Sequence, residues 1–100
     1  MKQHITPSQA QEITEEQFYS LFDEIVKRKD WAHFHHKKVT IGKCIEVLEN
    51  SNRFKGLHKS DTDGEYKVYV VLDDSNGWNE YIKSDKELVN ALWQAVKEIL

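Results

Sequence analysis

The stretch EYKVYVVLDDSNGWNEYIK, residues 65–83, decides the fold of this chain. Its first half is rich in aromatic, β-branched and large side chains, which suit a pleated strand. Because side chains alternate along a strand, one face is predicted to carry Tyr66, Val68, Val70 and Leu72. Asn76-Gly77 can adopt positive φ at low cost, and the chain then returns through residues 78–82. The stretch therefore predicts a β-hairpin that other apolar segments cover.

The segments on either side of this hairpin extend the pattern. Residues 54–59 read as a weaker strand, and the sequence from Asp61 to Gly64 is typical of a turn. Three consecutive strands joined by short turns predict an antiparallel meander. After the hairpin, Ser84 and Glu87 have the spacing of a capping box, which predicts a closing helix. Its apolar stripe consists of Leu88, Val89, Leu92, Trp93, Val96 and Ile99.

Two helices are predicted before the sheet. Thr14 and Gln17 form another capping box, and the apolar spacing predicts a helix over residues 15–29. Its apolar face contains Phe18, Leu21, Phe22, Ile25 and Val26. Thr40 is a candidate N-cap for the next helix, whose apolar face holds Ile41, Cys44, Ile45 and Leu48. Residues 30–38 between the two fit a loop, a short helical turn or a continuation of the first helix.

Together these elements predict an α+β fold in the order α-α-β-β-β-α. We expect a single domain over residues 13–100, in which a three-stranded antiparallel meander packs against helices. Residues 1–12 are polar and contain the only proline, so they are expected to form a flexible N-terminal lead or a short helical turn after Thr6-Pro7.

Composition narrows the class of protein. The chain has 100 residues, a net charge of −3 and three Trp, which fits one ordinary folded domain. The longest strictly apolar run, residues 68–72, is too short to span a bilayer, and the first residues lack the apolar stretch of a secretory signal. The one cysteine, Cys44, excludes an internal disulfide framework. These features lead us to expect a cytoplasmic protein with no membrane partner.

The histidines of the sequence His33-Phe34-His35-His36 are one candidate for chemistry. Histidine is a common ligand for transition metals, and pairs of these residues would share a face of a helix or a strand. A structural site usually needs four ligands, however, and no further cysteine or carboxylate stands at a recognised spacing. A metal-binding protein or metal-dependent enzyme using this cluster is therefore the weakest of three functional hypotheses.

Other reactive groups have simpler interpretations. Asp61, Asp63 and Glu65 faintly resemble a calcium loop, but position six of the loop would be Tyr66 instead of glycine. Cys44 falls on an apolar helix face, where a free cysteine usually behaves as a small hydrophobe. The nucleophile-elbow, P-loop and dinucleotide fingerprints are absent. We therefore expect no catalytic residue, no resident metal and no cofactor, and a protein that is not an enzyme.

A basic segment, residues 27–43, is a candidate nucleic-acid surface. It contains six Lys or Arg residues against one acid, Asp30, although the whole chain is acidic. Basic groups neutralise phosphates, and exposed aromatic rings can stack on single-stranded bases. The candidate contact residues are Lys27, Arg28, Lys29, Trp31, Lys37, Lys38 and Lys43. A simpler interpretation is that the first cations end a helix and the rings pack in the core.

The hypothesis that we favour is a small non-catalytic protein–protein interaction module. The sequence specifies a fold well but shows no catalytic constellation, and its hairpin is unusually rich in aromatic residues. If one face of the meander is uncovered, Tyr69, Val71 and Tyr81 would form an exposed patch of the kind that marks interfaces. The partner would be another protein or a second copy of the chain. In size and composition the chain resembles small accessory proteins of bacteria and their mobile elements.

Overall fold

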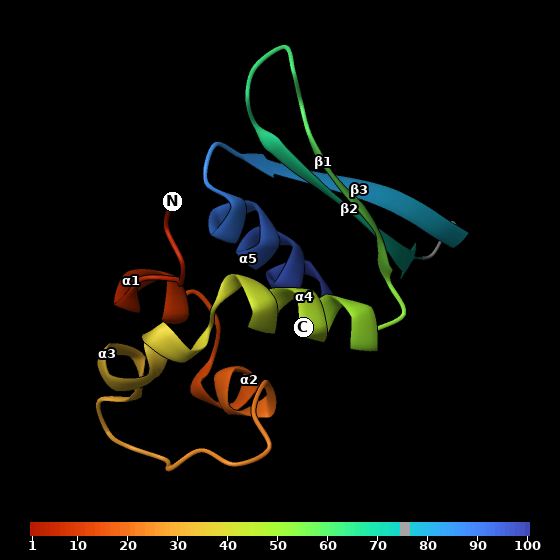
Figure 1. Cartoon of the computed structure of the whole chain (residues 1–100). Helices are drawn as coiled ribbons and strands as arrows, with labels where there is room; N and C mark the ends of the chain where they lie inside the picture. The colour runs from red at the N-terminus through yellow and green to blue at the C-terminus, as the bar shows by residue number, and fades with distance from the viewer. Residues whose placement is uncertain (75–76) are drawn as a thin grey trace.

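The computed structural model describes residues 1–74 and 77–100, and within them the predicted α+β architecture is confirmed. Helices precede a three-stranded antiparallel sheet of order β1-β2-β3, and one helix follows it (Figure 1). The elements are α1 (Pro7–Ala10), α2 (Glu15–Ser20), α3 (Trp31–His35), the 3-10 turn η1 (His36–Lys38), α4 (Ile41–Asn50), β1 (Phe54–Lys59), β2 (Tyr66–Asp74), β3 (Gly77–Asp85) and α5 (Leu88–Ile99).

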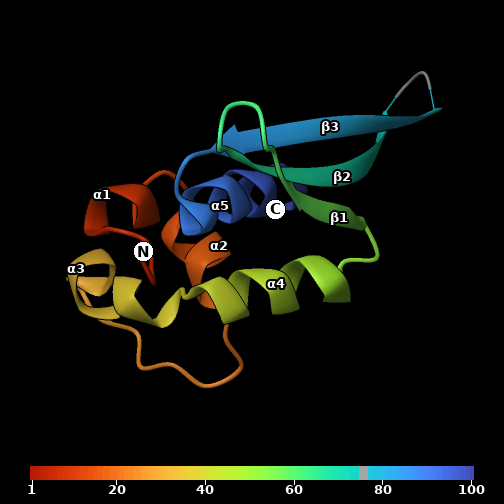
Figure 2. The ribbon, with the colours of Figure 1, turned by 45° about the horizontal axis from the view of Figure 1, so that its top comes forward.

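The elements form layers around the closing helix. Helix α5 packs against β2 and β3 on one side and against α4 on the other. The short helices α1, α2 and α3 lie to one side of this stack, away from the sheet (Figure 1). Figure 2 shows that α5 lies beneath one face of the sheet and that no helix of the described chain covers the opposite face. We call these the inner and the outer face.

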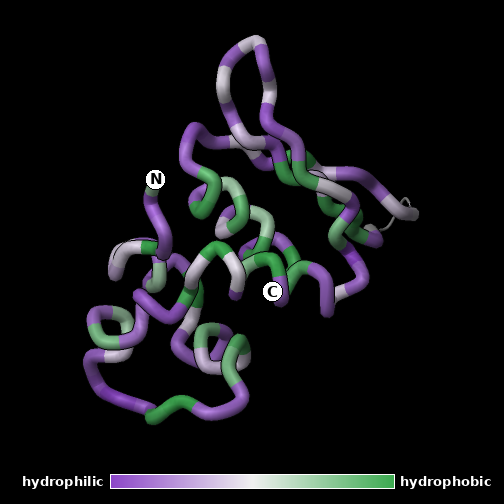
Figure 3. The backbone as a smooth tube through the Cα atoms, viewed as in Figure 1, coloured by the Kyte–Doolittle hydropathy of each residue, from purple (hydrophilic) through white to green (hydrophobic). Residues whose placement is uncertain are grey.

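The core lies between the inner face, α5 and the short helices. The largest side chains that are fully buried are Trp93, Phe18, Ile5, Leu48, Leu92, Val39, Val68, Val70, Val89, Val96 and Cys44. Hydrophobic stretches accordingly recur in α4, α5 and the strands, and one more lies in the otherwise hydrophilic loop between α2 and α3 (Figure 3). The Trp93 indole N–H donates a hydrogen bond of 2.9 Å to the Glu12 carboxylate, so its polar edge is satisfied while its ring fills the core.

The register of the hairpin agrees with the predicted alternation. Pairing of β2 with β3 runs without a shift from Tyr66 opposite Asp85 to Asp74 opposite Gly77. Val68 and Val70 are fully buried against α5, as the predicted apolar face requires. Gly77 has a φ of 102°, a value that glycine adopts at low cost. The predicted role of Asn76 lies outside the described residues.

The first helix of the predicted order is much shorter than residues 15–29. Its predicted start is confirmed, because the Thr14 hydroxyl accepts a hydrogen bond from Gln17 N–H, but α2 ends at Ser20. The following loop is held by tertiary hydrogen bonds that compete with helix continuation. The Tyr19 hydroxyl accepts from Arg28 N–H at 2.8 Å, and His35 Nε2 lies 2.9 Å from the Val26 carbonyl oxygen. The cations of residues 27–29 therefore belong to a loop and do not end a helix.

The start of the closing helix also differs from the prediction. Ser84 lies in β3, and the residue preceding α5 is Glu87, which makes no side-chain capping bond. Instead, the Asp85 carboxylate accepts from Glu87 N–H at 2.8 Å. The predicted capping box at Ser84 and Glu87 is therefore wrong, because the strand continues through both Ser84 and Asp85 to pair with the start of β2.

The N-terminal segment differs from a flexible lead. It forms the helical turn that was the alternative after Thr6-Pro7, and a reciprocal capping box joins Thr6 and Gln9. Ile5 is fully buried and donates a backbone hydrogen bond of 3.1 Å to Val39. Burial of Ile5 and Ala10 thus attaches these residues to the same core as the rest of the chain.

Candidate protein-interaction surface

The outer face of the sheet carries a cluster of apolar side chains. Residues that pair directly across two antiparallel strands project from the same face. Tyr69 pairs with Ile82, Val71 with Glu80 and Asp73 with Trp78. The apolar members of this face, which we call the outer patch, are Tyr69, Val71, Trp78 and Ile82. All four come from one hairpin, so a single supersecondary element positions the whole patch.

The outer patch is unusually exposed for such large side chains. Trp78 retains 66% of its accessible surface and Ile82 retains 54%, while Tyr69 and Val71 are half-buried. In the described structure no helix contacts this face, whereas Val68 and Val70 on the inner face are fully buried. An apolar cluster left in water is unfavourable for the free protein and is a common mark of a binding surface.

Tyr81 does not belong to this patch, which corrects one member of the predicted set. Its cross-strand partner is Val70, so Tyr81 projects from the inner face beside α5. Trp78 and Ile82 take its place on the outer face, and the sequence interpretation missed both. Asp74 pairs with Gly77, and this register assigns every residue of β3 to one face or the other.

Charged side chains of both signs surround the outer patch. The Arg53 guanidinium lies 5.7 Å from the centre of the Trp78 ring, a favourable cation–π distance. Lys55 Nζ lies 3.1 Å from a Glu80 carboxylate oxygen. This ion pair is exposed, so it adds little to stability. An apolar centre surrounded by a rim of positive and negative side chains is typical of protein interfaces.

The aromatic rings of the basic segment are engaged within the protein. Trp31 packs against Phe18, with ring centres 4.8 Å apart, and is half-buried. The Arg28 guanidinium lies 3.6 Å from the centre of the Phe34 ring, which is otherwise 52% exposed. Arg28 also donates a hydrogen bond to Asp30, which lowers the pKa of that carboxyl group. The predicted stacking partner Trp31 therefore belongs to the core cluster.

The cations of the same segment are in different surroundings. Lys27 lies 5.8 Å from the centre of the Tyr19 ring, and Lys43 Nζ lies 3.6 Å from a Glu46 carboxylate oxygen. Lys29, Lys37 and Lys38 are exposed, and the part of the chain that is described records no ion pair for them. The structure thus separates the segment: Trp31 packs against the core, Phe34 stays 52% exposed beside Arg28, and Lys29, Lys37 and Lys38 face solvent.

The three predicted histidines do not converge on one point. His36 is buried, and its Nδ1 lies 2.8 Å from the carbonyl oxygen of His33, whereas the His33 ring is exposed. His35 points instead toward Tyr19 and the Val26 carbonyl. His4, which sequence reasoning did not consider, lies nearest to His36, with ring centres 5.5 Å apart. Within the described residues no group of three or more potential ligands is placed to hold a metal ion.

The remaining candidate groups are structural. Cys44 is buried, and burial raises the pKa of its thiol to about 12, so the reactive thiolate is disfavoured at neutral pH. The Asp63 carboxylate accepts a hydrogen bond from Glu65 N–H at 2.9 Å, which lowers the pKa of Asp63. Gly64 follows with a φ of 73°. The acidic stretch before β2 is therefore a turn held by its own side chain.

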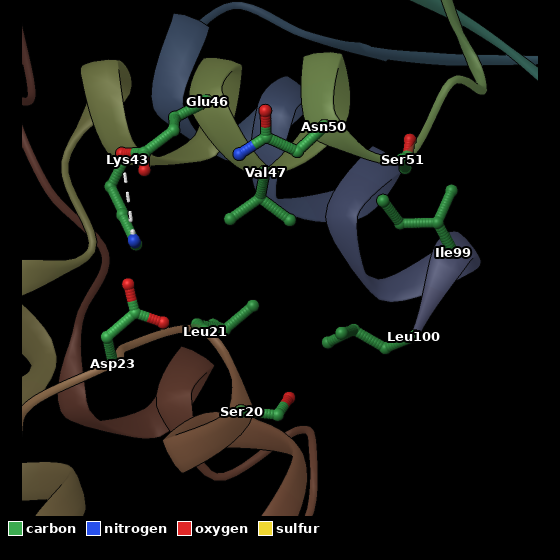
Figure 4. Close-up of a pocket in the computed structure, with 10 residues that line it drawn as sticks. All are labelled: Ser20, Leu21, Asp23, Lys43, Glu46, Val47, Asn50, Ser51, Ile99 and Leu100. Atoms are coloured by element: carbon green, nitrogen blue, oxygen red, sulfur yellow. Dashed lines mark ion pairs between the residues drawn. The ribbon is translucent and has the colours of Figure 1, made fainter.

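A pocket of about 350 Å³ lies between the end of α2, α4 and the C-terminal end of α5 (Figure 4). Lys43 points toward Asp23 at one side of the pocket, and Leu21 and Val47 line it from opposite sides. The Glu46 carboxylate that pairs with Lys43 is more than half exposed. The Lys43 side chain is only 20% exposed, so the ion pair joins a partly buried cation to a solvated carboxylate.

No protein-family model, no curated protein and no solved structure matched this chain. Across the described residues, no helix combines the length and the apolar character needed to cross a membrane.

Proposed function

We propose that this chain is a small non-catalytic protein-interaction module that binds a protein partner through the outer patch. The observation that carries the proposal is the exposure of Trp78 and Ile82 on a sheet face that no helix of the described structure covers. Tryptophan and tyrosine are enriched among the residues that dominate binding energy, because they bury much apolar area at a low cost in side-chain entropy. A partner would remove this surface from water.

The state of the reactive groups supports a binding role over catalysis. The Cys44 thiol has a raised pKa, and His35 and His36 are buried with ring nitrogens close to backbone carbonyl oxygens. A single free cysteine also fits a reducing compartment, which supports a cytoplasmic location. Nucleic-acid binding through the basic segment has less support, because Trp31 and Phe34 have partners within the chain.

Affinity capture from the native cells tests the proposal. We expect the wild-type chain to retain a defined protein partner and Trp78→Ala to lose it, with binding at least about tenfold weaker, as for a central aromatic residue. Phe34→Ala is the matched control, since Phe34 is also an exposed aromatic residue but lies in α3, away from the sheet. Equal capture by wild type and Trp78→Ala would contradict the proposal.

A salt titration separates the alternative function. Short single-stranded oligonucleotides should not bind at near-physiological salt if the module acts through a protein partner. Binding through the basic segment would fall steeply with salt, and each neutralised phosphate would contribute a slope of about −0.7 in log K against log salt. Replacing Lys37 and Lys38 together by Ala would then reduce that slope. Tight, salt-sensitive binding that these two lysines control would favour the nucleic-acid function.

A further inference from the structure

The two edges of the sheet differ in how they are protected from pairing with another strand. Strand β1 is short, its register with β2 shifts between Phe54 and Gly56, and it carries exposed Lys55 and Lys59. Short length, irregular pairing and lysine side chains are the devices by which proteins blunt the edge of a sheet. The β1 edge therefore discourages the addition of a further strand.

Strand β3, which forms the other edge, is longer than β1 and lacks its irregular pairing. All nine of its residues pair with β2 in one continuous register. It contains no proline, and its lysine, Lys83, is drawn to the inner face by an ion pair of 2.7 Å with Glu98 of α5. The strand is exposed along most of its length. Lys83 is an inward-pointing charge on this edge, and its ion pair with Glu98 neutralises it. A long, regular and exposed edge of this kind is a template for strand addition.

We propose that a second copy of this chain occupies the β3 edge. The two β3 strands would pair antiparallel about a two-fold axis at Ile82, which joins the two sheets into one of six strands. Such a contact is isologous, the commonest arrangement in protein dimers. The inference rests on the proposed function, because it names a partner for the same hairpin, and it places Ile82 of the outer patch at the centre of the contact.

The charge pattern of β3 favours this register over those centred on residues 80, 81 and 83. With Ile82 opposite the partner's Ile82, Glu80 faces the partner's Ser84 and Tyr81 faces the partner's Lys83. The Ile82 pair is an apolar contact, the pair of Glu80 with Ser84 is a polar contact, and the pair of Tyr81 with Lys83 is a cation–aromatic contact. Each kind of contact is favourable between antiparallel strands. A two-fold axis at Glu80 or at Lys83 would set like charges against each other, which is unfavourable. An axis at Tyr81 would place Glu80 beside the partner's Ile82, a charged group against an apolar one.

Sedimentation equilibrium of the purified full chain tests the pairing. We expect the wild type to dimerise reversibly between about 1 and about 300 µM, the range of a modest interface. Ile82→Lys and Ile82→Glu should each raise the dimer Kd at least about tenfold, because each places like charges across the two-fold axis. Mixing the two variants should restore a dimer. Val26→Lys is the matched control, since Val26 is 72% exposed but lies in the α2–α3 loop.

A second pair of variants tests the register without removing an apolar side chain. Ser84 is exposed and pairs with Lys67 of β2, so an acidic replacement should not unfold the monomer. Ser84→Glu sets a carboxylate opposite the partner's Glu80 and should raise the dimer Kd about two- to tenfold. Ser84→Lys should lower it by a similar factor. Equal dimer Kd values for both Ser84 variants would overturn the proposed register.

The outcomes separate this inference from the proposed function. A wild type that stays monomeric over the whole range, or a mixture of the two Ile82 variants that does not associate, overturns the β3 pairing. Neither result changes the capture of a different protein by the outer patch. Conversely, a dimer that follows these charge rules while Trp78→Ala captures the same proteins as the wild type supports the pairing and contradicts the proposed function.

Discussion

The inner and the outer face of the sheet carry similar side chains in different environments. On β2, Val68 and Val70 are fully buried by α5, whereas Tyr69 and Val71 are only half-buried on the other side. The reason is the number of helices, because α5 has one apolar stripe and can cover one face. An apolar strand pattern therefore does not distinguish a core from a binding surface. A face becomes part of the core only where a helix from the rest of the chain packs against it.

The largest expected effect is on the inner side. Trp93→Ala should reduce the free energy of unfolding by about 3–5 kcal/mol, because it removes a fully buried aromatic ring and leaves a cavity. Trp78→Ala is the matched change on the outer face and should cost less than about 1 kcal/mol, as exposed positions do. Urea denaturation followed by circular dichroism measures both. Similar losses for the two variants would remove the distinction between the faces.

A smaller effect is expected at the helix ends that bring the helices against the core. Thr14→Ala and Thr40→Ala should each reduce stability by about 1 kcal/mol, because each hydroxyl accepts a hydrogen bond from a first-turn amide. Ser84→Ala should change stability by less than about 0.5 kcal/mol, since Ser84 is an exposed strand residue and caps no helix. The midpoints of urea denaturation measure the losses in all three variants. A loss of stability in Ser84→Ala as large as that in Thr14→Ala would indicate that Ser84 caps α5 after all.

An effect that is absent at neutral pH concerns the buried thiol. Burial raises the pKa of Cys44 from 9.0 to about 12, so the unfolded chain releases the thiol proton at a lower pH than the folded chain. This contribution to stability is complete below about pH 9 and is lost as pH rises toward 12. The variant Cys44→Ala lacks that part of the pH dependence. Identical stability–pH profiles above pH 9, or rapid alkylation of the native thiol, would contradict a buried Cys44.

Local patterns in the sequence predicted much of the fold. The hairpin followed from side-chain alternation and a turn, and the starts at Thr14 and Thr40 followed from the chemistry of helix capping. The end of α2 could not be predicted, because hydrogen bonds from Tyr19 and His35 hold the next loop, and these contacts form only in the folded protein. The predicted continuation of this helix through Ile25 depended on apolar periodicity alone.

The candidate surface was predicted in part. Tyr69 and Val71 followed from alternation along β2, but the face of each β3 residue depends on the register across the turn. An approximate turn position was enough to predict a hairpin, whereas a shift of one residue exchanges Tyr81 for Ile82. Whether any face is uncovered depends on how many helices reach the sheet. That is a property of the whole chain and not of the hairpin.

The central claim is that the outer patch is the surface that binds a partner. Hydroxyl-radical footprinting of the free chain and of the captured complex measures the accessibility of each side chain directly. We expect Trp78 to be oxidised in the free protein and protected in the complex, with Phe34 equally reactive in both and Trp93 unreactive throughout. A Trp78 that remains as reactive in the complex as in the free protein would contradict the account.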